Sequence, residues 1–148
     1  DGVVNPGNYK VLFGTNQNEL IEAAGGLKEG CEKVISGGPM MGFAMYTTDT
    51  PITKTSSSIL CMSKDEVSAC EPTACINCGR CVDACPSRII PSRLADFAER
   101  HDEEAFLKFN GLECVECGSC SYVCPAKRQL KQAIGSMRKT ALANKKKK

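Results

Sequence analysis

The sequence has 148 residues, of which 42% are hydrophobic and 24% charged, and its formal net charge is +2. This length leaves room for one ordinary domain or two small ones, and no apolar run approaches the roughly 20 residues that a membrane-spanning helix needs. An odd count of 11 cysteines and the lack of a secretory signal argue against a disulfide framework. Because the chain starts at Asp1 rather than at methionine, we expect a piece of a longer protein.

Residues 1–66 contain no metal-binding motif, and their pattern predicts a compact mixed α/β module. A short helix is predicted at Leu20–Ala24, with Asn16 as a candidate cap and Gly25-Gly26 as the stop signal. Strand-like composition occurs in five segments: 9–13, 32–36, 43–46, 51–55 and 58–62.

Two features of this module could bind a ligand, but each has a simpler interpretation. The segment Gly37–Gly42 lacks the G-x-G-x-x-G spacing of a phosphate-binding loop, which favours a tight turn with positive φ. Three methionines, Met40, Met41 and Met45, are typical of residues that fill gaps in a core.

Residues 63–74 are polar and include Pro72, which indicates a linker. Cys70 lies in this linker and could be a spare metal ligand. A bystander thiol is the favoured interpretation, as it is for Cys31 and Cys61.

The cysteines after the linker form two copies of one pattern. The first copy is Cys75-x-x-Cys78-x-x-Cys81-x-x-x-Cys85-Pro86, and the second, 39 residues later, is Cys114-x-x-Cys117-x-x-Cys120-x-x-x-Cys124-Pro125. This is the bacterial iron–sulfur pattern, in which four thiolates hold a [4Fe–4S] cluster.

In two-cluster proteins with this pattern, the fourth cysteine ligates the cluster of the other copy. Gly79 and Gly118 would let the backbone approach the inorganic sulfide. A cluster with four cysteine ligands has no open position for a substrate, so this chain alone is predicted to carry single electrons and to have no catalytic residue. The predicted ligand sets are Cys75, Cys78, Cys81 and Cys124 for cluster 1, and Cys114, Cys117, Cys120 and Cys85 for cluster 2.

Two structural zinc sites in an interaction module are the alternative interpretation of the eight cysteines. Zinc usually takes two separated pairs of ligands, which explains triplets at a three-residue step poorly. Metal content separates the two interpretations.

The 28 residues between Cys85 and Cys114 are predicted to be helical. Leu94, Phe97 and Ala98 fall on one helical face, with Ser92 available as the cap. A second short helix should begin at 102–104, where acidic residues suit the helix dipole, and end at Asn110-Gly111. His101 lies between these helices and is interpreted as a solvent-facing loop residue.

After Pro125 the sequence predicts a longer helix and a basic end. Leu130, Ala133, Ile134 and Met137 recur at helical spacing. From Pro125 onward there are nine basic residues and no acidic one, whereas the preceding part has a balance of −7. The basic face could be solvated, or could meet anionic lipid or an acidic partner protein. Nucleic acid is not expected, because no aromatic or groove-reading element accompanies the charge.

The whole chain resembles the C-terminal part of the RnfC family, whose members belong to the ion-translocating Rnf electron transport complexes. The cluster motifs alone do not single out this family, because helical ferredoxins of fumarate reductases, heterodisulfide reductases and glycolate oxidases share them. Gly14-Thr15, Leu20–Gly26 and Val34–Gly42 are similar to the family's soluble-ligand-binding β-grasp segment. Cys114–Pro125 is also close to the family's second motif.

This resemblance implies the electron-relay part of a membrane-associated NADH:ferredoxin oxidoreductase that translocates sodium ions or protons. It implies a peripheral position on the cytoplasmic side of a prokaryotic membrane. The expected partners are other Rnf subunits, with ferredoxin or NADH reached only indirectly. FMN and NADH are expected only in the family's larger N-terminal region, which is absent here. The alternative is the iron–sulfur subunit of a soluble dehydrogenase or reductase of the types just named.

The predicted fold class is therefore α+β. We expect a β-grasp-like module at 1–66, a mainly α-helical ferredoxin-type domain with two [4Fe–4S] clusters at 67–140, and a basic, disordered tail at 141–148.

Overall fold

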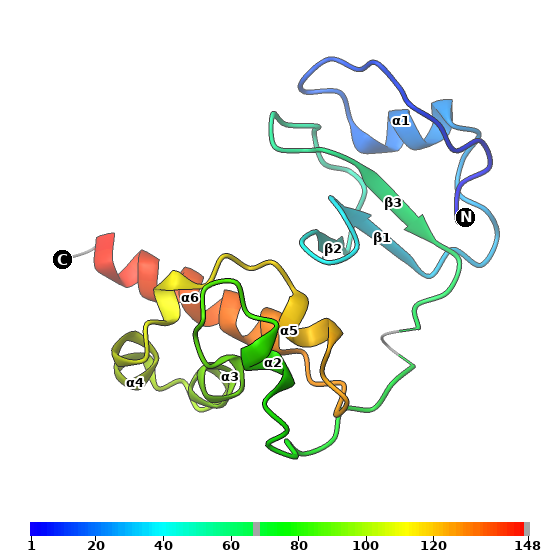
Figure 1. Ribbon diagram of the computed structural model, residues 1–148. Coiled ribbons are helices and arrows are strands. Elements are labelled where there is room, and N and C mark those ends of the chain that lie inside the picture. Colours follow the sequence, from blue (N-terminus) through cyan, green and yellow to red (C-terminus); the bar gives the residue numbers. More distant parts are fainter. Residues whose placement is uncertain (67–68, 147–148) are drawn as a thin grey trace. The chain divides into compact units, whose positions relative to one another are not determined.

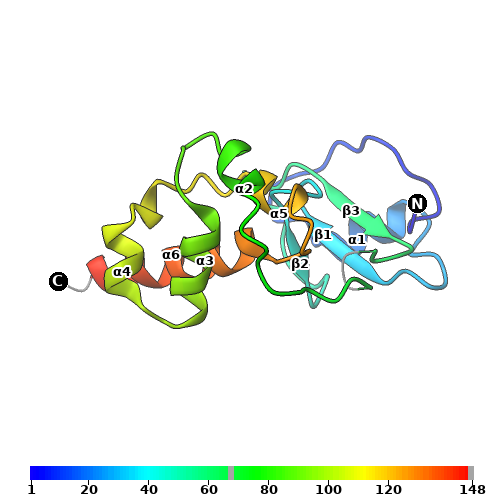
Figure 2. The same ribbon diagram turned by 60° about the horizontal axis from the view of Figure 1, so that its bottom comes forward.

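The computed structural model describes residues 1–66 and 69–146. The chain divides into two compact units, an N-terminal unit of Asp1–Ala69 and a C-terminal unit of Cys70–Lys148. Figures 1 and 2 show a small sheet with a helix in the first unit and a set of helices in the second. The boundary between the units lies a few residues after the predicted one.

The N-terminal unit contains the helix α1 at Gln17–Ala23, in the place that the sequence predicts. The side chain of Asn16 caps it by accepting a hydrogen bond of 2.9 Å from the N–H of Asn18. Gly25 and Gly26 follow with φ of 86° and 85°, a left-handed conformation that ends the helix.

Three antiparallel strands form the sheet of this unit: β1 at Lys33–Ser36, β2 at Phe43–Met45 and β3 at Ile59–Met62. β1 lies in the middle, and its Val34 pairs with Met45 on one side and Cys61 on the other. Gly37, with φ of 99°, begins the turn between β1 and β2, and the N–H of Gly42 donates to the carbonyl of Gly38 at 2.8 Å. The predicted tight turn is therefore confirmed.

Two predicted strands are wrong. Segment 9–13 has no strand conformation, and its Leu12 and Phe13 are 82% and 69% exposed, so no neighbouring strand covers them. Segment 51–55 forms only an isolated bridge between Pro51 and Asn16. Proline has no N–H to continue a ladder, which limits this pairing.

The three methionines of this unit do not all fill its core as expected. Met40 and Met41 lie in the exposed turn before β2 and are 43% and 63% exposed, because the tight turn directs this segment away from the sheet. Met45 is half-buried on β2.

The C-terminal unit is helical, as predicted. Its core is formed by Leu94, Ala95, Phe106 and Ile134, each 0% exposed, together with Leu130. Its elements are α2 (Arg80–Asp83), α3 (Pro91–Glu99), α4 (Glu103–Lys108), η1 (Gly111–Glu113), α5 (Ser119–Tyr122) and α6 (Leu130–Lys146). Both views show α3 running beside α6, with the short helices α2 and α5 next to each other (Figures 1 and 2).

The caps of the two middle helices differ in origin. Ser92 is not the cap of α3: the N-cap is Ile90, without a side-chain hydrogen bond, and Pro91 occupies the first turn. Proline suits that position because its missing N–H would be unpaired there anyway. At α4 the prediction is confirmed, since the side chain of Asp102 accepts from the N–H of Ala105 at 2.9 Å. His101 lies between the helices, exposed, with φ of 56°.

The last helix is longer than predicted. Leu130, Ile134 and Met137 are buried as expected, and Ala141 extends the same stripe at 3% exposure. Asn144 also donates to Glu103 at 2.7 Å. The predicted disordered tail is therefore wrong for 141–146, because the apolar stripe continues past 140, and residues 147 and 148 lie outside the described residues. Within the part of the chain that the structure describes, no helix is long and apolar enough to cross a membrane.

Candidate iron–sulfur centre

The 39-residue repeat of the cysteines recurs in the backbone. Gly79 and Gly118 have φ of 79° and 85°, and each immediately precedes a four-residue helix, α2 or α5. Left-handed conformation also occurs at non-glycine residues of the two repeats, at the same offset: Asn77 and Glu116 (both 54°), and Arg88 and Lys127 (54° and 53°).

Positive φ at asparagine, glutamate, arginine and lysine is uncommon and costs on the order of 1 kcal/mol or more per residue. Both loops nevertheless keep it at equivalent places around the cysteines. Alternation of left-handed and right-handed residues turns backbone N–H groups to one side of the chain, a conformation that binds anionic groups. The loops therefore have the backbone shape of an anionic cluster site in both repeats.

Two cavities in the C-terminal unit are lined by the predicted ligands. Cavity 1 has Cys75, Cys78, Cys81 and Cys124 in its wall, together with Asn77 and Arg128. Cavity 2 has Cys85, Cys114, Cys117 and Cys120, together with Glu116 and Lys131. Each cavity thus takes three cysteines from one repeat and the fourth from the other, the same grouping that the spacing predicts.

Contacts between the repeats bring these cysteines together. The N–H of Thr73, just before the first repeat, donates to the carbonyl of Ala126, just after the second, at 3.0 Å. Cys120 belongs to the hydrophobic core of the unit, and four other predicted ligands pack against that core: Cys81, Cys85, Cys114 and Cys124. The helices therefore fold around the two cavities.

The two cavities differ in burial. Cys75 and Cys78 of cavity 1 are exposed, whereas Cys120 of cavity 2 is only 8% exposed and Cys114 is half-buried. Cavity 1 is consequently the one closer to solvent.

The thiols of cavity 2 differ in acidity. Burial raises the pKa of Cys120 to about 11, and burial also raises the pKa of Cys114, although the N–H of Glu116 opposes this at 3.4 Å from its sulfur. Ser119 lowers the pKa of Cys117, whose Sγ lies 3.5 Å from the hydroxyl oxygen. Because iron binds thiolates, loading the cavity would release protons, chiefly from the buried thiols.

The eight cysteines do not converge on single points. Among the described residues, no three His, Cys, Asp or Glu side chains are grouped closely enough to hold one metal ion. Thiols spread around a cavity wall fit a polynuclear cluster, whose several irons each take one thiolate, better than one zinc ion.

Two ion pairs beside the cavities escaped the sequence analysis. Arg128 donates to Asp96 at 2.9 Å and to Glu99 at 3.0 Å. Burial alone would lower the pKa of Arg128, but the two carboxylates outweigh it and raise the pKa. Arg138 pairs with Glu116 at 3.2 Å. The only sequence signal for these residues is their position in the repeat.

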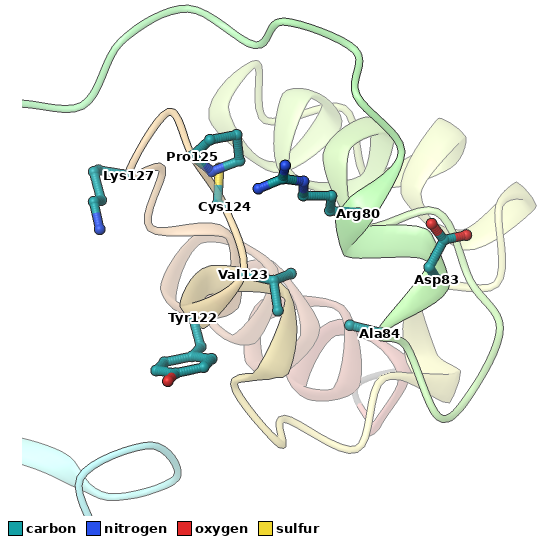
Figure 3. A pocket seen from close by; sticks show the side chains of 8 residues that line it. All are labelled: Arg80, Asp83, Ala84, Tyr122, Val123, Cys124, Pro125 and Lys127. Atoms are coloured by element: carbon teal, nitrogen blue, oxygen red, sulfur yellow. The ribbon is translucent and has the colours of Figure 1, made fainter.

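A wide hollow of about 780 Å³ lies where α2 and α5 meet. Figure 3 shows Arg80 reaching toward Cys124 and Pro125, with Tyr122 and Lys127 on the opposite wall. Tyr122 is 79% exposed, so this hollow is an open depression beside a predicted ligand rather than an enclosed site.

The three remaining cysteines line neither cavity. Cys61 is buried on β3, and this burial raises its pKa, whereas Cys31 is half-buried in the same unit and Cys70 is exposed. Their interpretation as bystander thiols stays a prediction.

Comparison with known proteins agrees with this division of the chain. The family model of the 4Fe-4S dicluster domain matches residues 74–128, and that of the SLBB domain matches residues 1–44. The chain is 40% identical over 147 residues to the RnfC protein of the Na(+)-translocating ferredoxin:NAD(+) oxidoreductase complex of Acetobacterium woodii, covering 99% of this chain and 33% of the relative.

Two further relatives are RnfC proteins of similar complexes. Identity is 49% over 130 residues to that of the proton-translocating ferredoxin:NAD(+) oxidoreductase complex of Clostridium ljungdahlii, covering 87% of this chain and 28% of the relative. It is 46% over 132 residues to that of the ion-translocating oxidoreductase complex of Methanosarcina acetivorans, covering 89% and 30%. This chain belongs to the RnfC family. It spans about a third of the length of these family members, and the two matched domains fall in its two units.

Proposed function

We propose that the chain is the electron-relay part of an ion-translocating ferredoxin:NAD oxidoreductase complex of the Rnf type. In this proposal, one [4Fe–4S] cluster is held in cavity 1 and a second in cavity 2. The ligands are Cys75, Cys78, Cys81 and Cys124 in cavity 1, and Cys114, Cys117, Cys120 and Cys85 in cavity 2.

The observation that carries the proposal is the pair of cavities, each lined by four thiols from both repeats. When bound, [4Fe–4S] clusters gain and lose single electrons. The chain's own contribution is to hold four sulfurs around each cavity, to present backbone N–H groups through the left-handed residues, and to exclude water from Cys120. Exchange of a ligand between repeats keeps the two cavities close, as a relay requires.

The family relationship suggests the setting of this relay. We infer that it docks on the cytoplasmic face of the membrane against other Rnf subunits, and that FMN and NADH bind in parts of the longer family members outside this chain. The SLBB match, α1 and the antiparallel sheet support a β-grasp type for residues 1–66. The basic α6 end, Lys145 and Lys146, fits attachment to an anionic surface.

Metal analysis and spectroscopy test the relay directly. Protein prepared without oxygen should contain about eight iron and eight sulfide per chain, and after dithionite reduction it should give EPR signals of two interacting clusters. One or two zinc ions without sulfide would overturn the proposal.

Single substitutions test the ligand exchange. Cys124→Ser should make the cluster of Cys75, Cys78 and Cys81 labile and lower the iron content toward about four per chain, because only three thiolates remain there. Cys85→Ser should do the same to the other cluster, and Cys70→Ser, the control, should leave about eight. Equal loss from both cavities in either variant would count against the exchange.

Removal of Lys145–Lys148 tests the attachment. The truncated protein should bind vesicles that contain anionic lipid more weakly than the intact chain, by roughly 1 kcal/mol per basic residue near the surface. Unchanged sedimentation with such vesicles, measured at low and moderate salt, would remove this role from the tail.

A further inference from the structure

Equivalent positions of the two repeats carry different charges next to the cavities. On the loops, Arg128 beside cavity 1 occupies the position that Ile89 occupies beside cavity 2. Likewise Glu116 of cavity 2 corresponds to Asn77 of cavity 1. Each cavity thus has one ionic loop residue that its counterpart lacks, with a positive charge at cavity 1 and a negative charge at cavity 2.

The helices carry the opposite charges at equivalent positions. Asp96 and Glu99 of α3 correspond, at the same offset, to Gly135 and Arg138 of α6. The acidic pair on α3 binds Arg128, whereas the basic residue on α6 binds Glu116. The two ion pairs are therefore charge-reversed copies of each other.

At cavity 1, Arg128 holds the segment that follows Cys124. Its guanidinium is 11% exposed and contacts two carboxylates of α3 at 2.9 and 3.0 Å. Arg128 comes four residues after Cys124, the ligand that cavity 1 takes from the other repeat. This contact ties the borrowed ligand's segment to the helix of the first repeat.

At cavity 2, Glu116 lies between Cys114 and Cys117. Its N–H donates to Cys114 Sγ at 3.4 Å, and its carboxylate accepts from Arg138 at 3.2 Å. Arg138 also donates to the carbonyl of Leu112 at 3.2 Å, so it holds the loop at two points. Gly135 leaves space for the carboxylate, since a Cβ there would lie 3.1 Å from Glu116 Oε2.

We propose that Arg128 is a positioning residue for the cluster of cavity 1, and that the Glu116–Arg138 pair positions the ligands of cavity 2. This inference rests on the proposed function. The contacts join protein atoms alone, so they arrange each set of thiols before iron arrives. Their reversed charges also disfavour exchanged docking of the two similar loops, because Glu116 would meet Asp96 and Glu99 on α3.

Cysteine protection in loaded protein tests the proposal. Variants Arg128→Gln and Glu116→Gln are prepared without oxygen, challenged with an iron chelator and treated with iodoacetamide, and the labelled cysteines are identified by mass spectrometry. Arg128→Gln should lose about four iron and expose the four cysteines of cavity 1 to labelling while those of cavity 2 stay protected. Glu116→Gln should give the opposite pattern.

Control and conservative variants separate positioning from a general loss of stability. Lys139→Gln and Glu104→Gln remove exposed charges of the same signs on α6 and α4, and both should keep about eight iron. Arg128→Lys should retain more iron than Arg128→Gln, since it keeps the charge but not the fork of donors. If Arg128→Gln does not fold, Arg128→Lys and the partner substitution Glu99→Gln still test cavity 1.

The outcomes are distinct. Loss confined to the predicted cavity supports the proposal, whereas equal loss from both cavities, loss from the wrong cavity or no loss in any variant overturns it. Wild-type protein that takes up no iron and sulfide would instead overturn the proposed function itself.

Discussion

At the scale of single residues, the environment of each cysteine separates thiols that the sequence presents as equivalent. Cys117 and Cys120 stand at neighbouring places of one motif, yet Cys120 is 8% exposed with its pKa raised to about 11, and the pKa of Cys117 is lowered by Ser119. Burial disfavours the thiolate, whereas a hydroxyl that donates to sulfur favours it.

This difference predicts a pH-dependent order of chemical labelling in the metal-free protein. Near pH 8, iodoacetamide should modify Cys117 well before Cys120, because the thiolate is the reactive form. As the pH rises toward 11, Cys120 ionises and the gap should narrow. Mass spectrometry of timed samples measures both rates.

Ser119→Ala is the matched variant for this measurement. It should slow labelling of Cys117 at about pH 8, since the pKa of Cys117 returns toward its usual value, and should leave Cys120 unchanged. Equal rates for the two cysteines in the unsubstituted protein at that pH would contradict the assigned environments.

At the scale of elements, the short η1 turn depends on the absence of a side chain at Gly111. A Cβ at this position would lie 2.3 Å from the ring of Phe106, which is 0% exposed. Sequence analysis identified Asn110-Gly111 as a helix stop, and Asn110 does adopt φ of 60°. The close approach of Gly111 to Phe106 involves tertiary packing, which no local pattern contains.

Gly111→Ala should therefore destabilise the C-terminal unit by about 1–3 kcal/mol through overpacking. Denaturant titration of the metal-free protein, followed by circular dichroism, measures the change. The double variant Gly111→Ala with Phe106→Leu should lose less than the sum of the two single losses, because the smaller side chain makes room for the methyl group. Strict additivity would show that the Phe106 ring is not the obstacle.

At the scale of the whole molecule, the two units differ in what stabilises them. The N-terminal unit buries Val34, Ile35 and Cys61 in a sheet of its own. The C-terminal unit builds its core on five of its predicted ligand cysteines. If these cysteines hold clusters, ligation contributes folding free energy to one unit only.

Iron removal should accordingly affect the units unequally. After chelation under mild oxidation, amide hydrogen exchange should accelerate around α2, α5 and the start of α6, while β1 and β3 keep their protection. Mass spectrometry of peptides from loaded and stripped protein compares the two units in one sample. Equal loss of protection in both units would mean that the N-terminal unit depends on the clusters.

Local patterns foresaw much of this chain, and their failures share a cause. The periodicity of Leu94, Leu130 and Ile134 predicted helices that the structure confirms. Predicted strands at 9–13 and 51–55 were wrong because strand formation needs a partner, and partners are distant in sequence. The tail at 141–146 was misjudged because Ala141 finds a place in the core and Asn144 bonds to Glu103.

Spacings of a few residues are enough to predict the cysteine repeat, the grouping of the thiols into two sets of four, and the helical character of the connections. They do not predict that Cys120 is buried while Cys75 and Cys78 are exposed, or that Arg128 and Glu116 find partners on different helices. Burial and ion pairing depend on which distant segments meet. In this chain that choice follows from the packing of α3 against α6, which no short stretch of residues encodes.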